Sequence, residues 1–234
     1  MSNLLEITDL HVHYPDGTPG LDGVSLTVPE GGRVGLIGPN GAGKTSLLLG
    51  VMGALKFTGE VRVDGIALSR RTTDEVRSRC GMVFQNPDDQ LFMPTLLEDV
   101  AFGPLNQGCT PEEAEQRSLE AIRDVALDGF GKRAAHHLSG GQKRNASLAT
   151  ILSMRVKLLL LDEPGAGLDF RSRRRLLGIL AGRPEAMLLA SHDLDMVREL
   201  CADVVLLEAG HVAAAGPADR VLDDAHLLAR HGLA

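Results

Sequence analysis

The stretch that decides the fold reads Gly38-Pro39-Asn40-Gly41-Ala42-Gly43-Lys44-Thr45. It matches a pattern in which a glycine, four arbitrary residues and a second glycine precede lysine and then serine or threonine. Residues 33–37 before it, which are apolar after Arg33, indicate a short buried strand, and residues 45–49 after it indicate a first helical turn. Backbone N–H groups of such a turn and of the helix N-terminus point to one place, where a polyphosphate fits. We therefore predict a phosphate-binding loop between a strand and a helix.

Individual residues of this loop have separate expected roles. Lys44 would place its charge at the β- and γ-phosphates of ATP, and the Thr45 hydroxyl would bind Mg²⁺. Ser46, in the same turn, belongs to the expected nucleotide site. The alternative is a chance match in a chain with 27 glycines, and the strand and helix that flank the motif argue against it.

Composition limits the class of protein. The chain has 234 residues, of which 44% are apolar, which is enough for one large domain with a sizeable core. The net charge of −7 argues against a general nucleic-acid binder, and the basic run at residues 171–175 is best explained as a solvated helix face. Three scattered cysteines fit a reduced cytosolic protein, and no secretory leader or membrane-spanning run is visible.

Hydrophobic periodicity predicts an α/β fold. Alternating residues predict strands at 5–12, 24–28 and 60–65, separated by turns such as 15–20. Helices are expected within 96–151, where Thr110 would cap a helix that starts at Pro111, and at 173–180. Continuous apolar runs, which are typical of buried parallel strands, occur at 158–161, 186–190 and 204–207. The tail at 217–233 is a candidate amphipathic helix.

Two acids close one of the buried strands. Asp162 and Glu163 follow the apolar run 158–161 directly. Asp162 would hold Mg²⁺, and Glu163 would polarise the water that attacks the γ-phosphate. Any buried strand can end in acidic residues, so the assignment of Asp162 and Glu163 to an ATP site depends on the phosphate loop earlier in the chain.

A second anion site is predicted at Ser139-Gly140-Gly141-Gln142, which we call the signature segment. A hydroxyl, free N–H groups and a helix N-terminus would meet there. One nucleotide rarely needs two such sites within one chain, so we expect this segment to serve ATP held by a second copy. The alternative is an ordinary turn with a helix cap.

These motifs, with Gln85, Asp169 and His192, occur in the order found in the nucleotide-binding subunits of ABC transporters, which this chain resembles over nearly its whole length. The resemblance implies a P-loop NTPase of the RecA-like type. An N-terminal antiparallel β subdomain and a parallel sheet core of this type would together occupy 1–85 and 152–215. An inserted α-helical subdomain would occupy 86–151, and a helical tail 216–234.

The resemblance also implies further roles. Gln85 would bind Mg²⁺ and the attacking water and link the nucleotide to a membrane partner. His192 would contact the γ-phosphate, and Asp169 would contact the second subunit of the dimer. Tyr14 would stack on adenine, unless it is simply a half-exposed strand residue.

A narrower similarity points to energy-coupling-factor importers. Residues 85–92 resemble that group, and 14–18 and 227–233 resemble its cobalt and nickel ATPases. The implied partners are a second ATPase, in a homodimer or heterodimer, and integral membrane scaffold and substrate-capture subunits. The chain would then lie on the cytoplasmic face of the membrane. Asp88 and Asp89 would pair with basic residues of the scaffold, and Leu91, Phe92 and Met93 would form an apolar floor.

The sequence departs from the family at two positions and leaves alternatives open. Most relatives have arginine where this chain has Asn145, and serine or threonine where it has Gly165. Neither change removes a phosphate or Mg²⁺ ligand.

Too few residues separate Gln85 from Leu138 for the long coiled coil of chromosome-maintenance ATPases. A non-hydrolysing regulatory module would normally lack Glu163 or His192. An importer ATPase outside the energy-coupling-factor group remains open.

Overall fold

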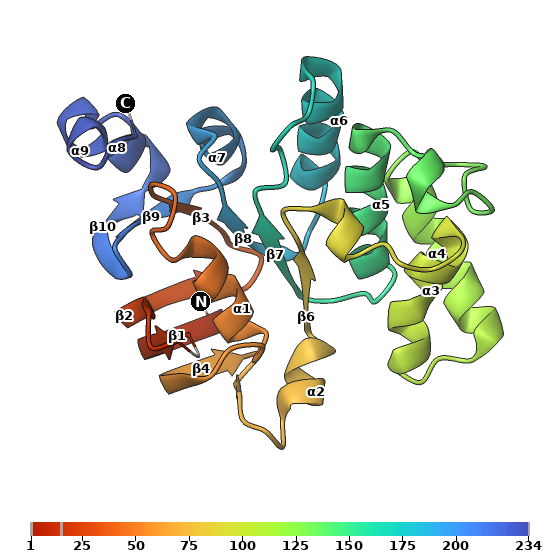
Figure 1. Cartoon of the computed structure of the whole chain (residues 1–234), viewed down its shortest axis with the longest axis horizontal. Coiled ribbons are helices and arrows are strands. Elements are labelled where there is room, and N and C mark those ends of the chain that lie inside the picture. The colour runs from red at the N-terminus through yellow and green to blue at the C-terminus, as the bar shows by residue number, and fades with distance from the viewer. Residues whose placement is uncertain (1, 15, 234) are drawn as a thin grey trace. The chain divides into compact units, whose positions relative to one another are not determined.

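The computed structural model describes residues 2–14 and 16–233, so Pro15 of the predicted turn lies outside the described residues. The chain forms two compact units (Figure 1). The first contains the residues up to Met82, Lys157–Glu163 and the residues from Pro184 onward. The second contains Val83–Val156 and Pro164–Arg183.

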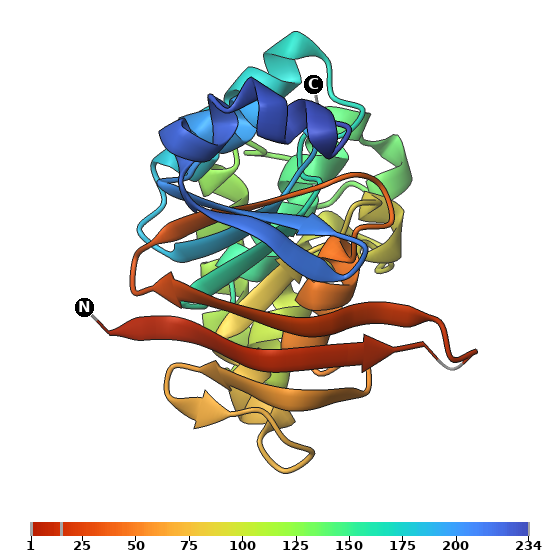
Figure 2. The ribbon, with the colours of Figure 1, turned by 90° about the vertical axis from the view of Figure 1, so that its left-hand side faces the viewer.

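An antiparallel sheet begins the first unit. Its strand order is β2-β1-β4-β5, with β1 at Asn3–His13, β2 at Pro19–Pro29, β4 at Phe57–Val63 and β5 at Ile66–Ala67. Figure 2 shows β1 and β2 running alongside each other. Ile7 of β1 pairs with Leu26 and Val61, and all three are buried, which explains the alternation seen in the sequence. The predicted N-terminal antiparallel sheet is confirmed.

The second sheet of this unit is mostly parallel, as predicted. Its order is β10-β9-β3-β8-β7-β6, with strands at Arg33–Ile37 (β3), Cys80–Val83 (β6), Leu158–Asp162 (β7), Ala186–Ala190 (β8), Asp203–Glu208 (β9) and His211–Pro217 (β10). β9, β3, β8 and β7 pair in parallel, and every residue of β7 is buried. β10 is an antiparallel edge strand that the sequence did not predict, because its alanines and glycine give a weak apolar signal.

In the described part of the first unit there are five helices: α1 at Lys44–Val51, α2 at Thr73–Arg77, α7 at Leu194–Leu200, α8 at Ala218–Leu222 and α9 at Ala225–Arg230. The single helix expected at 217–233 is wrong. β10 extends to Pro217, α8 ends at Leu222, and Asp224 starts a new helix by accepting a hydrogen bond from the Leu227 N–H at 2.9 Å. An aspartate in that capping role favours a helix start over a helix interior.

The second unit is helical. It contains α3 at Leu96–Asn106, α4 at Pro111–Asp124, α5 at Gly140–Leu152, α6 at Phe170–Ala181 and two 3₁₀ turns at Pro87–Asp89 and Ala135–His137. Thr110 caps α4 as predicted, in a reciprocal pair with Glu113. α6 belongs to this unit, whereas the sequence placed 164–183 with the sheets. Its close approach to α5 explains the difference, since a Cβ on Gly141 would lie 2.6 Å from the Ser172 Oγ.

Candidate functional site

The predicted phosphate loop joins β3 to α1 in the first unit. Its backbone needs glycine at two positions. Gly38 has φ 150°, and a Cβ there would lie 2.2 Å from the carbonyl oxygen of Leu207. Gly43 has φ 103°, and a Cβ there would lie 2.6 Å from the carbonyl oxygen of Gly20. The loop therefore has the tight turn that presents N–H groups at the start of α1.

Lys44 lies inside this loop. Its Nζ donates to the carbonyl oxygens of Gly38 at 2.7 Å and Pro39 at 3.1 Å, and the residue is buried. Burial lowers the pKa of Lys44, and the charges of Glu163 and Asp162 act in the opposite direction. An ammonium group that is removed from water in this way interacts strongly with phosphate oxygens.

Thr45 and Asp162 meet at the end of β7. The Thr45 Oγ1 donates to Asp162 Oδ2 at 2.9 Å, and Asp162 is 2% exposed. A hydroxyl and a carboxylate are the hard oxygen donors that Mg²⁺ prefers, together with substrate phosphates. These two residues therefore fit a Mg²⁺ site in which the metal bridges the protein and a nucleotide.

Glu163 is held in a fixed direction by the loop after β8. Its carboxylate accepts hydrogen bonds from the Ser191 hydroxyl at 3.2 Å and the His192 N–H at 3.0 Å. The Nδ1 of His192 lies 2.8 Å from the same carboxylate. The Glu163 side chain is 8% exposed and the His192 side chain 62% exposed. This arrangement suits a general base, because Ser191 and His192 fix the orientation of the Glu163 carboxylate.

Tyr14 contacts the phosphate loop. Its hydroxyl lies 2.7 Å from the Ser46 Oγ, and the ring passes Gly20 so closely that a Cβ there would lie 3.0 Å from Tyr14 Cε2. The ring is half-buried, so one part of it remains accessible. This location agrees with an aromatic surface next to the nucleotide site.

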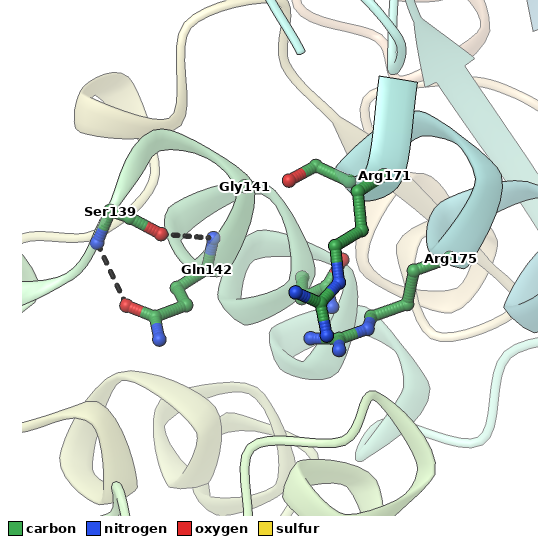
Figure 3. Close-up of a pocket in the computed structure, with 7 residues that line it drawn as sticks. Ser139, Gly141, Gln142, Arg171 and Arg175 are labelled. Carbon is green, nitrogen blue, oxygen red and sulfur yellow. Dashed lines mark hydrogen bonds between the residues drawn. The ribbon is translucent and has the colours of Figure 1, made fainter. Parts of the chain in front are cut away.

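The signature segment forms the N-terminus of α5 in the second unit. The Ser139 Oγ accepts from the Gln142 N–H at 3.3 Å, and the Gln142 Oε1 accepts from the Ser139 N–H at 2.8 Å (Figure 3). Both Ser139 and Gly140 are exposed. The segment is therefore a helix cap, as one interpretation held, and it also presents a hydroxyl and N–H groups to an approaching anion.

Asp169 is exposed and caps α6, where its Oδ1 accepts from the Ser172 N–H at 2.7 Å. That hydrogen bond lowers the pKa of Asp169, with a smaller contribution from Arg171. Asp169 is thus a fixed, ionised group on the surface of the second unit.

Gln85 follows β6, and its side chain is exposed. Its backbone is anchored by a residue that we did not predict. Arg144 of α5 is buried and donates to the carbonyl oxygens of Phe84 and Gln85, each at 2.7 Å. A charged residue on the apolar side of the helix at 140–152 was the available signal. Gln90 adds to this anchor, since its Oε1 accepts from the Phe84 N–H at 3.2 Å.

The predicted site residues thus form two groups. The first unit brings together Tyr14, Gly38–Ser46, Asp162, Glu163 and His192. The second unit carries Gln85, Ser139–Gln142 and Asp169.

The segment 88–93, which the sequence analysis expected to contact the scaffold, differs from that expectation at Asp88 and at Leu91. Asp88 pairs with Lys143 of the same chain at 2.6 Å, and Leu91 is buried at 6% exposure. Phe92 is 63% exposed and packs edge-to-face on Phe102, with ring centroids 5.2 Å apart. Phe92 of this loop and Phe102 of α3 are therefore the exposed aromatic rings here, and Leu91 belongs to the core.

Comparison with known proteins gives consistent matches. The sequence profile of the ABC transporter family matches residues 21–166. The energy-coupling factor transporter ATP-binding protein EcfA of Methanothermobacter thermautotrophicus is 42% identical over 98% of this chain and 76% of the relative. CbiO1 of Clostridium perfringens, part of the ABC transporter complex cbiONQ, superposes with a TM-score of 0.85 at 30% identity, over 100% of this chain and 96% of that one. The ATP-binding cassette MJ0796, in a dimeric post-hydrolysis state with ADP and phosphate, gives 0.82 at 26% identity, over 92% and 98%.

Proposed function

We propose that this chain, which belongs to the ABC transporter family and is one of its ATP-hydrolysing subunits, powers an energy-coupling-factor type importer. The observation that carries the proposal is the group of the phosphate loop, Asp162 and Glu163 in one unit, with Glu163 oriented by Ser191 and His192. Similarity to EcfA and to CbiO1 supports the type of transporter.

In the proposed reaction, Lys44 and the N–H groups of the loop bind the phosphates and offset their charge. Glu163 accepts a hydrogen bond from the attacking water and aligns it, and His192 stabilises charge on the γ-phosphate. Thr45, Asp162 and Gln85 would hold Mg²⁺, which supplies charge neutralisation on the phosphate oxygens when bound. Positioning and electrostatics provide most of the rate enhancement in such phosphoryl transfers.

The complete site is proposed to need two copies. Ser139, Gly140, Gly141 and Gln142 of one copy would contact the γ-phosphate held by the other, and Asp169 would contact the facing subunit. Two chains would then pair through a two-fold axis, with a nucleotide at each of two equivalent sites. One chain carries a complete set of motifs, which supports a homodimer over a heterodimer. Hydrolysis removes the contact through the γ-phosphate and weakens the pair.

The membrane partner is proposed to dock on the loop that follows Gln85. Among the described residues no helix has the length and apolar character needed to span a bilayer. A scaffold subunit would therefore recruit the chain to the cytoplasmic face, and Phe92 and Phe102 would provide the apolar contact. Cobalt or nickel is the proposed cargo on the sequence resemblance alone. Another small solute is the alternative.

The test is Glu163→Gln. Glutamine keeps the size of the side chain but is a far weaker hydrogen-bond acceptor for water, so ATP turnover should fall by about 10²–10⁴-fold. Binding of ATP, measured by equilibrium titration, should stay near that of the original chain. Glu199→Gln is the matched control, because Glu199 is exposed on α7, and it should keep full turnover. A Glu163→Gln chain that hydrolyses ATP at an undiminished rate would remove Glu163 from the proposed role.

A further inference from the structure

Side-chain hydrogen bonds tie the residues that follow β6 to one face of α5, and all of their partners lie in the second unit. We infer that Arg144 is a positioning residue for ATP hydrolysis, because it fixes the backbone from which the Gln85 amide extends. The inference rests on the proposed function, in which Gln85 helps to hold Mg²⁺. Arg144 itself is not among the residues assigned to the nucleotide or the metal.

Arg144 binds two successive carbonyl groups with one guanidinium. Its Nη1 donates to the Phe84 oxygen and its Nη2 donates to the Gln85 oxygen, each at 2.7 Å. Arg144 is 3% exposed, so these charge-assisted hydrogen bonds form away from bulk water. The planar guanidinium sets the direction as well as the distance of both carbonyl groups, which an ammonium on a flexible lysine stem does not.

Gln90 fixes the same backbone through a second set of bonds. Its Oε1 accepts from the Phe84 N–H at 3.2 Å. Its Nε2 donates to the Ser147 carbonyl oxygen at 2.9 Å and to the Thr150 Oγ1 at 2.7 Å. The N–H and the carbonyl group of Phe84 are therefore both bound by side chains that α5 carries or holds. Phe84 cannot shift relative to α5 without breaking these bonds.

The partners on α5 follow one face of the helix. Arg144, Ser147 and Thr150 are three positions apart, and helical residues at this spacing are neighbours. Lys143 adds an ion pair with Asp88, in which Nζ and Oδ1 are 2.6 Å apart and Asp88 is exposed. Exposed ion pairs contribute little energy, so we assign the main contribution to the buried Arg144.

Phe84 and Gln85 lie just beyond the strand that precedes them. β6 ends at Val83, and the Gln85 side chain is exposed. Mg²⁺ requires nearly octahedral coordination at about 2.0–2.1 Å, so a small displacement of one ligand weakens its binding. Fixing the backbone of Gln85 therefore places its amide for this role. Because α5 begins with the signature segment, Arg144 also ties Gln85 to the element proposed to reach the second nucleotide.

The first test measures steady-state ATP turnover of the full-length chain. Arg144→Met removes both donors and keeps a long, unbranched side chain that suits a buried position. The maximal rate should fall about tenfold or more, because a misplaced group loses its contribution to the reaction. In a Gln85→Ala background Arg144→Met should cause no further loss, since its effect passes through Gln85.

Arg155→Met is the matched control, because Arg155 is exposed just after α5, and it should keep the original rate. A loss that is equally large with and without the Gln85 amide would make the role of Arg144 purely structural and overturn the inference.

A second test requires no hydrolysis. Exchange of the backbone amide hydrogens at 84–90, followed by NMR, should be faster in Arg144→Met than in the original chain and in Arg155→Met. Unchanged exchange in this segment would overturn the inference whatever the turnover. An original chain that lacks ATP turnover would contradict the proposed function, and the exchange data would still decide whether Arg144 fixes the Gln85 backbone.

If Arg144→Met does not fold, Arg144→Lys replaces it in both tests. It keeps the charge but lacks the planar group, so it should show smaller changes in the same directions. Original turnover and original exchange in Arg144→Lys would then overturn the inference.

Discussion

Glu163 adopts a left-handed backbone conformation with φ 45°, although it is not glycine. Conformations of this kind cost on the order of 1–3 kcal/mol and occur where the surroundings hold them in place. Here the Glu163 N–H donates to the Ala190 carbonyl oxygen at 2.8 Å, and the carboxylate is bound by Ser191 and His192. These contacts hold the carboxylate against the loop after β8, near enough to Lys44 for its charge to act on the pKa of that residue.

We predict that His192→Ala lowers ATP turnover, but by less than Glu163→Gln does. The substitution removes the Nδ1 contact with Glu163 but leaves the Ser191 hydroxyl and the backbone N–H of residue 192. ATP turnover should fall at least about tenfold, yet less than in Glu163→Gln. Steady-state rates at saturating ATP provide the comparison. Full activity, or a larger loss than Glu163→Gln shows, would contradict the assigned roles.

Helix α5 connects several parts of the second unit. Its N-terminal turn carries the signature segment, Arg144 fixes the backbone next to Gln85, and Asn145 donates to the carbonyl oxygen of Val125 at the end of α4. Asn145, one of the two departures noted in the sequence, therefore serves helix packing here. The same helix therefore positions the signature segment and the Gln85 backbone and contributes to the stability of the second unit.

We predict that Asn145→Ala destabilises the chain by about 1–3 kcal/mol, because it leaves a buried carbonyl group without its donor. Asn106→Ala is the control, since Asn106 makes the same type of bond to the Phe102 carbonyl oxygen at an exposed position. Its effect should stay below about 0.5 kcal/mol. Urea unfolding followed by circular dichroism measures both. Equal midpoints for the two variants would refute the structural role of Asn145.

Sequence patterns predicted those elements whose signals are local. The strand, loop and helix around Lys44, the buried run of β7 and the cap at Thr110 all follow from short-range rules. Features that depend on distant partners were missed. β10 has too little apolar character to be recognised without β9, and α6 joins the second unit because Gly141 admits Ser172. Arg144 was missed for the same reason, since its partners at 84 and 85 lie about 60 positions away.

At the scale of the whole molecule, the chain is expected to act only within an assembly. We predict that Phe92→Ser prevents co-purification with the proposed membrane scaffold subunit, because the most exposed ring near the proposed docking segment is lost. Leu119→Ser, which replaces an apolar residue of α4 that is 44% exposed, is the control and should co-purify normally. Nucleotide binding should be intact in both. Normal assembly of Phe92→Ser would place the docking surface elsewhere.

Each nucleotide site is proposed to be completed by a second copy of the chain. Sedimentation velocity of Glu163→Gln, with and without ATP and Mg²⁺, distinguishes such a shared site from a site within one chain. We predict a monomer without ATP and a dimer with ATP, and we predict that adding Ser139→Arg to Glu163→Gln abolishes the dimer while ATP still binds. A Glu163→Gln chain that stays monomeric with ATP bound, or a dimer that tolerates Ser139→Arg, would contradict the shared site.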